Sequence, residues 1–96
     1  MFIKKFTHTI PPIHYEGVEV SWIRHRDLHL LTVGRFTYTS DQRFISIHNP
    51  MTEDWTLQIR YPQRRDSGVY ECQVGTTPPI GHAMHLSVVV LPVGGV

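Results

Sequence analysis

The residue types of a hydrolase triad lie in the second half of this chain. Asp66, Ser67 and His85 would act as orienting acid, nucleophile and general base. However, Ser67 lies in an Asp-Ser-Gly turn and not in a Gly-x-Ser-x-Gly elbow, and we expect Asp66 to pair with Arg43. The sequence also has no phosphate-binding loop and no carboxylate pair. These features predict a protein that is not an enzyme.

Seven histidines raise the question of a metal site. His25 and His29 are four positions apart, but they lie in an expected strand and turn and so do not share a helical face. His82 and His85 have odd spacing, which puts them on opposite sides of one strand. No carboxylate or cysteine completes a ligand set near them. We expect no metal and no cofactor, and we expect the histidines to be polar surface residues that could tune an interface at about pH 6.5.

The single cysteine, Cys72, has no partner for an intrachain disulfide or a Cys-x-x-Cys motif. Its place in an alternating run puts it in the core beside Trp22, which predicts a buried and inert thiol. The alternatives are an intermolecular disulfide and a redox sensor, and a reactive thiolate would need polar, electropositive surroundings.

The charge balance gives little support to a nucleic-acid-binding function. The formal net charge is +1 and the isoelectric point is about 8.0. The basic residues Arg60, Arg64 and Arg65 are local, and acidic residues offset them. We expect Arg64 and Arg65 to lie in a solvated turn.

The elements that must position these residues are short strands. The 96 residues suit one small domain, and no long stretch shows a helical period. Short alternating runs are bounded by glycine, proline and asparagine, as in strands and turns. The expected strands span residues 20–26, 28–33, 35–39, 43–47, 55–60, 69–74 and 84–90, with a hairpin loop at 76–81. Seven strands at this spacing predict an all-β antiparallel sandwich or barrel.

Local features narrow the choice to an immunoglobulin sandwich. Trp22 lies on an early strand, fifty positions before Cys72. Tyr70 lies two positions before Cys72, which is the place of the tyrosine in a tyrosine corner. We expect Gly68 to supply an unusual φ and Asp66 to pair with Arg43 at the end of the sandwich. Two extra strands between Trp22 and Arg43 indicate the C′ and C″ strands of a variable-type domain.

The chain resembles, over about three quarters of its length, the first immunoglobulin domain of the Dpr (defective proboscis extension response) family of insect neuronal cell-surface proteins. The segments that carry the resemblance are residues 20–29, 31–34, 38–44, 54–59 and 66–74. The resemblance implies extracellular recognition at the neuronal plasma membrane. It also implies a partner, a Dpr-interacting protein (DIP) of the immunoglobulin superfamily, and a role in synaptic partner choice.

The N-terminal segment departs from the family pattern. Residues 1–19 show no sustained period, contain Pro11-Pro12 and lack the strand B cysteine, so we expect strands A and B and the B–F disulfide to be missing. The expected organisation is an atypical segment at 1–19, an immunoglobulin-like domain at 20–91 and the start of a linker at 92–96. We identify no signal peptide and no membrane anchor. Attachment to the membrane would therefore belong to a longer product.

Alternation predicts which residues line the outer face of the C-C′-C″-F-G sheet. With Trp22 inward, Ile23 and His25 point outward, whereas the register of C′ stays open. The predicted partner-binding residues are Ile23, His25, Leu30, Leu31, Val33, Phe36, Tyr38, Gln73 and His85. The predicted structural residues are Trp22, Arg43, Asp66, Tyr70 and Cys72. Exposed apolar groups framed by polar ones are typical of an interface.

The functional prediction is a recognition module that binds another immunoglobulin domain, with no nucleic acid and no small-molecule substrate. One alternative is that the apolar groups of C′ and C″ only cap the core. Another is a truncated, partly folded isoform or gene-model fragment without binding activity, and a third is homophilic adhesion.

Overall fold

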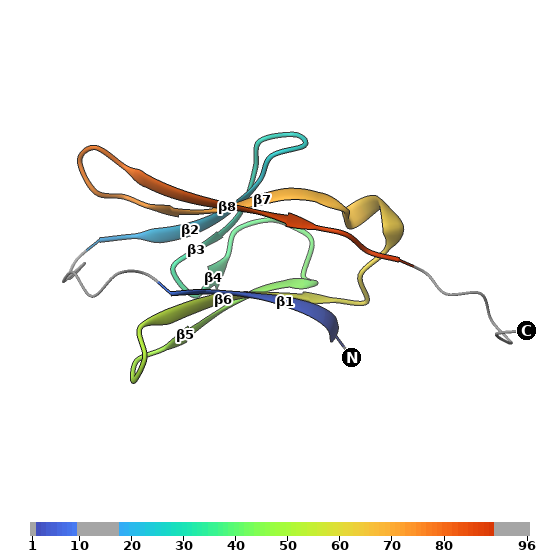
Figure 1. Cartoon of the computed structure of the whole chain (residues 1–96), viewed down its shortest axis with the longest axis horizontal. Helices are drawn as coiled ribbons and strands as arrows, with labels where there is room; N and C mark the ends of the chain where they lie inside the picture. The colour runs from blue at the N-terminus through green and yellow to red at the C-terminus, as the bar shows by residue number, and fades with distance from the viewer. Residues whose placement is uncertain (1, 10–17, 90–96) are drawn as a thin grey trace, which may run out of the picture.

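A computed structural model describes residues 2–9 and 18–89, the former by their backbone, as two facing antiparallel sheets (Figure 1). The five-stranded sheet has the order β4-β3-β2-β7-β8 and consists of β2 (Val20–Arg24), β3 (His29–Val33), β4 (Phe36–Thr37), β7 (Gly68–Val74) and β8 (Ile80–Leu86). The three-stranded sheet has the order β1-β6-β5 and consists of β1 (Phe2–Thr9), β5 (Phe44–Asn49) and β6 (Asp54–Arg60). These orders are those of strands C″-C′-C-F-G and B-E-D of a variable-type immunoglobulin domain, so the predicted fold class is confirmed.

The expectation that no strand precedes Val20 is wrong. β1 pairs antiparallel with β6, from Phe2 opposite Arg60 to Thr9 opposite Asp54, and takes the place next to strand E that strand B has in an immunoglobulin sheet. Residues 2–9 alternate poorly, but strand formation depends on pairing with a neighbouring strand as much as on local pattern. Pro11 and Pro12 lie outside the described residues.

Two other strands differ most from their predicted bounds, which are 35–39 and 84–90. β4 covers only two residues, because the chain leaves the sheet edge after Thr37, and the N–H groups of Tyr38 and Thr39 both donate to the Leu31 carbonyl. β8 begins at Ile80, inside the predicted hairpin loop, and ends at Leu86. Ile80 pairs with Val74 of β7, so ladder pairing extends the hairpin beyond what the turn residues indicated.

The core lies between the sheets and is built from alternate residues of their strands. Trp22, Cys72 and Tyr70 are fully buried, and Trp22 is the cross-strand partner of Cys72, as the sequence predicted. Buried residues from other strands complete it: Val20, Leu31, Phe44, Leu57, Ile59, Val74 and Leu86. The Phe44 ring lies 6.4 Å from that of Tyr70, which ties the two sheets together near one end.

No helix in the described ranges, 2–9 and 18–89, is long and apolar enough to span a membrane. The one helical element there is a single 3₁₀ turn, η1 (Arg64–Asp66), between β6 and β7.

A candidate partner-binding face and the network that supports it

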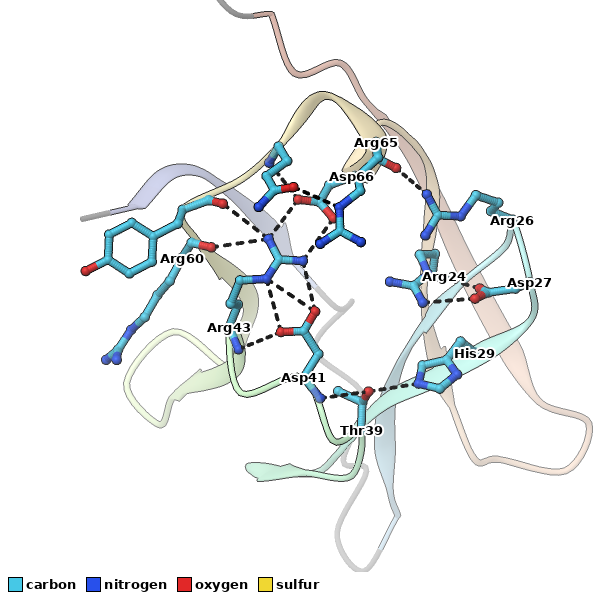
Figure 2. A network of polar contacts seen from close by, with 12 residues as sticks. Arg24, Arg26, Asp27, His29, Thr39, Asp41, Arg43, Arg60, Arg65 and Asp66 are labelled. Carbon is cyan, nitrogen blue, oxygen red and sulfur yellow. Dashed lines mark hydrogen bonds and ion pairs between the residues drawn. The ribbon is translucent and has the colours of Figure 1, made fainter.

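An ion-pair network closes the end of the sandwich where β5 and β7 begin (Figure 2). The Arg43 guanidinium donates through Nη1 and Nη2 to the two Asp66 carboxylate oxygens, at 2.8 and 3.0 Å, which is the predicted pair. Arg43 also bonds the Asp41 carboxylate and the Tyr61 carbonyl. Asp66 is 1% exposed and accepts a further bond from the Gln63 backbone N–H. The network thus holds the β6–β7 connection against the start of β5.

The tyrosine corner predicted at Tyr70 is present. The Tyr70 hydroxyl donates to the Asp66 backbone carbonyl at 2.6 Å, inside the core. Between them Gly68 has φ +140°, a conformation that a residue with a side chain rarely adopts. The side chain and the backbone of Asp66 therefore bind different elements, and together they fix the turn.

The Asp66 carboxyl should make the free energy of unfolding depend on pH in the acid range. Burial raises its pKa, but hydrogen bonds from Arg43 and the Gln63 N–H outweigh burial and hold the pKa below its ordinary value. A carboxyl with a lowered folded-state pKa stabilises the fold above its unfolded pKa of about 3.9, and this contribution is lost as the pH falls further. We expect the free energy of unfolding, measured in urea at steps from neutral to acid pH, to decrease below about pH 4. Asp66→Ala should flatten this decrease, and an equally steep curve in that variant would contradict the assignment.

We expect the buried thiol of Cys72 to be unreactive. Burial, with a smaller contribution from the negative charge of Glu71, raises its pKa to about 12. Because the thiolate is the reactive form, the native chain should react with iodoacetamide at mildly alkaline pH about 1,000-fold more slowly than an unfolded thiol. Mass spectrometry of samples with and without urea measures this ratio. Equal rates in both samples would show that Cys72 is accessible.

The strand registers place most of the predicted partner-binding residues on one surface of the five-stranded sheet, named here the outer face. Ile23 is the cross-strand partner of both Leu30 and Glu71, so these three side chains share a side, opposite to that of Trp22. Ser21 likewise pairs with Val33 and Gln73. Phe36 continues this row at the sheet edge, opposite Val33, and is 68% exposed.

The remaining predicted residues lie at the margins of the outer face. The His25 N–H donates to the Val69 carbonyl, and Val69 pairs with His85, so both histidines lie where β7 begins. Tyr38 follows β4 and is 62% exposed. The outer face thus combines partly buried aliphatic side chains in its middle with exposed aromatic residues at one edge and histidines at one end.

Leu31 does not belong to this face. The β2–β3 register passes from Trp22 opposite Thr32 to Ile23 opposite Leu30, which leaves Leu31 as the extra residue of a β-bulge. Both Leu31 and Thr32 are fully buried. Leu31 is therefore a core residue, and its prediction as a partner-binding residue is wrong. The bulge lets Leu31 and Thr32 both face the core between the outward Leu30 and Val33.

Glu71 is not among the predicted partner-binding residues, yet it lies in the middle of the outer face. Its Oε1 is 2.5 Å from His25 Nε2, and its Oε2 occupies space that a side chain on Gly81 would fill. A side chain at position 81 would therefore displace the Glu71 carboxylate from this place. The alternation of β7 already turns Glu71 outward, but only the β7–β8 register reveals the glycine that receives it.

The histidines of residues 18–89 do not assemble into a metal-binding group. His25 lies beside Glu71, His29 Nε2 is 2.8 Å from Thr39 Oγ1, and His48 stacks on Trp55 at a centroid distance of 4.3 Å. Among residues 18–89, no three His, Cys, Asp or Glu side chains come together as a ligand set.

Comparison with known proteins identifies the family, although no family model matches the chain. A solved structure of Dpr1 IG1 bound to DIP-eta IG1 is 47% identical, with a TM-score of 0.82, and the match covers 91% of this chain and 80% of the other. The chain belongs to the Dpr family. A structure of Dpr2 Ig1–Ig2 in complex with DIP-Theta Ig1–Ig3 is 48% identical to this Dpr domain, with a TM-score of 0.84, and the match covers 92% of the present chain.

This Dpr domain spans only part of some of its relatives. It covers 39% of the Dpr2 chain. It is also 32% identical, over 74 residues, to the Zwei Ig domain protein zig-8 of Caenorhabditis elegans, a match that covers 77% of this chain and 27% of that protein. The likeness to Dpr first domains confirms the resemblance that the sequence indicated.

Proposed function

We propose that this Dpr domain is a non-catalytic recognition module that binds an immunoglobulin-superfamily partner of the DIP type through its outer face. The protein would act on the extracellular side of the neuronal plasma membrane, in synaptic partner choice. The observation that carries the proposal is the continuous outer face on a domain that is 47% identical to Dpr1 IG1, whose structure was solved bound to DIP-eta IG1.

The chemistry of the outer face supports face-to-face docking. Ile23, Leu30 and Val33 supply aliphatic surface, and Phe36 and Tyr38 are exposed aromatic residues. Aromatic residues are enriched in interface cores and hot spots, and polar groups are typical of the rim. Gln73 and His85 are polar groups of the same face.

The direct test is equilibrium binding of the 96-residue chain to immobilised first domains of a panel of DIP proteins, by biolayer interferometry. Saturable binding to at least one of them supports the proposal, and absence of binding to every one of them contradicts it. Sedimentation equilibrium of the chain alone examines homophilic adhesion, since a dimer at micromolar concentration would favour self-pairing instead. A cooperative thermal transition with a near-ultraviolet tryptophan signal would contradict the partly folded alternative.

A further inference from the structure

Four arginines gather at the end of the sandwich opposite the β5–β6 turn. Arg60 ends β6, Arg64 and Arg65 begin η1, and Arg26 lies in the β2–β3 turn. β2 ends where β7 begins, since Arg24 pairs with Tyr70, so this turn lies beside η1. Figure 2 shows Arg26 reaching across to bond the Arg65 backbone carbonyl. All four side chains are exposed, and they are named here the arginine cluster.

The acidic groups at this end do not neutralise the arginine cluster. Asp27 accepts two bonds from Arg24, at 3.0 and 2.9 Å, and Asp41 and Asp66 both bind Arg43 (Figure 2). Within residues 18–89, no carboxylate lies within ion-pair distance of Arg26, Arg60, Arg64 or Arg65. The sequence analysis predicts that acidic residues balance the charge of these arginines. In the structure those acidic residues instead bind Arg24 and Arg43.

Hydrogen bonds fix the backbone segments that carry Arg26, Arg64 and Arg65 of the arginine cluster. The buried Asp66 carboxylate fixes η1 to Arg43 and to the Gln63 N–H, and Arg65 Nε donates to Gln63 Oε1 at 2.8 Å. The bond from Arg26 to the Arg65 carbonyl ties the β2–β3 turn to the same element. A cation array on an ordered scaffold loses less conformational entropy on binding than one on a loose loop.

We propose that the arginine cluster binds a sulfated polysaccharide of the glycosaminoglycan class. Guanidinium groups match the oxygens of sulfate and carboxylate groups bidentately. Four separate arginines on one strand end and two turns suit a linear polyanion, which contacts each of them in succession and releases counterions. Tyr61, 64% exposed beside Arg60, adds a ring against which a sugar can pack.

The alternative occupant is an anionic lipid surface. Anionic lipids are concentrated in the cytoplasmic leaflet. This site rests on the proposed function, which places the domain on the extracellular side, where the abundant polyanions are sulfated polysaccharides. For this reason we favour the polysaccharide and treat the lipid as an outcome of the experiment.

The experiment measures binding of a heparin oligosaccharide to the 96-residue chain by isothermal titration calorimetry at several salt concentrations. If the polysaccharide behaves as a single-stranded polyelectrolyte in contact with four arginines, its affinity should fall roughly 50-fold between about 50 and about 200 mM NaCl. In Arg60→Gln/Arg64→Gln the same change of salt should lower the affinity only roughly sevenfold. Neither side chain makes a hydrogen bond to another residue of the range 18–89, so folding should be retained. The near-ultraviolet circular dichroism of each variant checks this.

A matched control is available at the other end of the molecule. Arg35 is an exposed arginine in the β3–β4 turn, so Arg35→Gln removes the same charge as Arg64→Gln but outside the arginine cluster. We expect weaker heparin binding in Arg64→Gln and unchanged binding in Arg35→Gln. Equal losses in both variants, no binding by the wild-type chain at about 50 mM salt, or binding to phosphatidylserine vesicles and not to heparin would each overturn the proposal.

The two proposals fail separately. Tyr38→Asp should lose the protein partner and keep heparin binding, because Tyr38 lies outside the arginine cluster. Heparin binding that fails while DIP binding persists removes only the polysaccharide site. If the wild-type chain binds heparin but no DIP first domain, only the proposed protein partner is ruled out.

Discussion

Asp66→Ala is expected to lower the free energy of unfolding by about 3 kcal/mol, because it leaves the partly buried Arg43 guanidinium without its main partner. The Arg43 side chain is 18% exposed and that of Asp66 is 1% exposed, so water replaces little of the lost interaction. The substitution also removes the acceptor for the Gln63 N–H. Small domains have only about 5–15 kcal/mol in total, and this domain lacks an intrachain disulfide. Urea denaturation followed by tryptophan fluorescence measures the change.

Asp41→Ala is the matched control for that substitution. Asp41 binds the same guanidinium, at 2.9 Å, but its side chain is 35% exposed, so solvent screens the pair. We expect a loss of less than about 1 kcal/mol. Equal losses for the two aspartates would show that burial of the carboxylate is not what makes the pair with Asp66 strong.

Tyr38→Asp is expected to weaken binding of the DIP-type partner by about 100-fold or more, since it puts a charge where an aromatic hot spot would be desolvated. Tyr38 is 62% exposed, so the free domain loses little packing and should unfold at nearly the same urea concentration. Biolayer interferometry against the best-binding DIP first domain measures the ratio of dissociation constants.

Tyr61→Asp makes the same chemical change away from the outer face. Tyr61 is 64% exposed and has φ +47°, a conformation that aspartate tolerates comparatively well. We expect its affinity for the partner to stay within about threefold of the wild type, since residues outside an interface contribute little. Unchanged affinity in Tyr38→Asp, or an equal loss in both variants, would remove Tyr38 from the interface.

Much of the fold could be predicted from local patterns. Period-two alternation around Trp22, Tyr70 and Cys72 fixes which side chains enter the core, because successive residues of a strand face opposite ways. The Asp-x-Gly-x-Tyr-x-Cys segment also encodes its own turn, including the positive φ of Gly68 and the Tyr70 hydrogen bond. These features arise from residues close together in the sequence, so the sequence alone determines them.

Other features depend on which strands meet and in what register. Residues 2–9 become a strand by pairing with β6, and a bulge opposite β2 turns both Leu31 and Thr32 toward the core. Glu71 meets Gly81 only through the β7–β8 ladder, and the arginine cluster forms only where two turns converge.

The sequence by itself determined the immunoglobulin core and the side of each regular strand that faces it. The tertiary structure decided the extent of the three-stranded sheet, the residues of the outer face and the carboxylates that each arginine engages. The physical reason is that alternation is a local property of one strand, whereas register, bulges and ion pairing depend on segments that are distant in the chain.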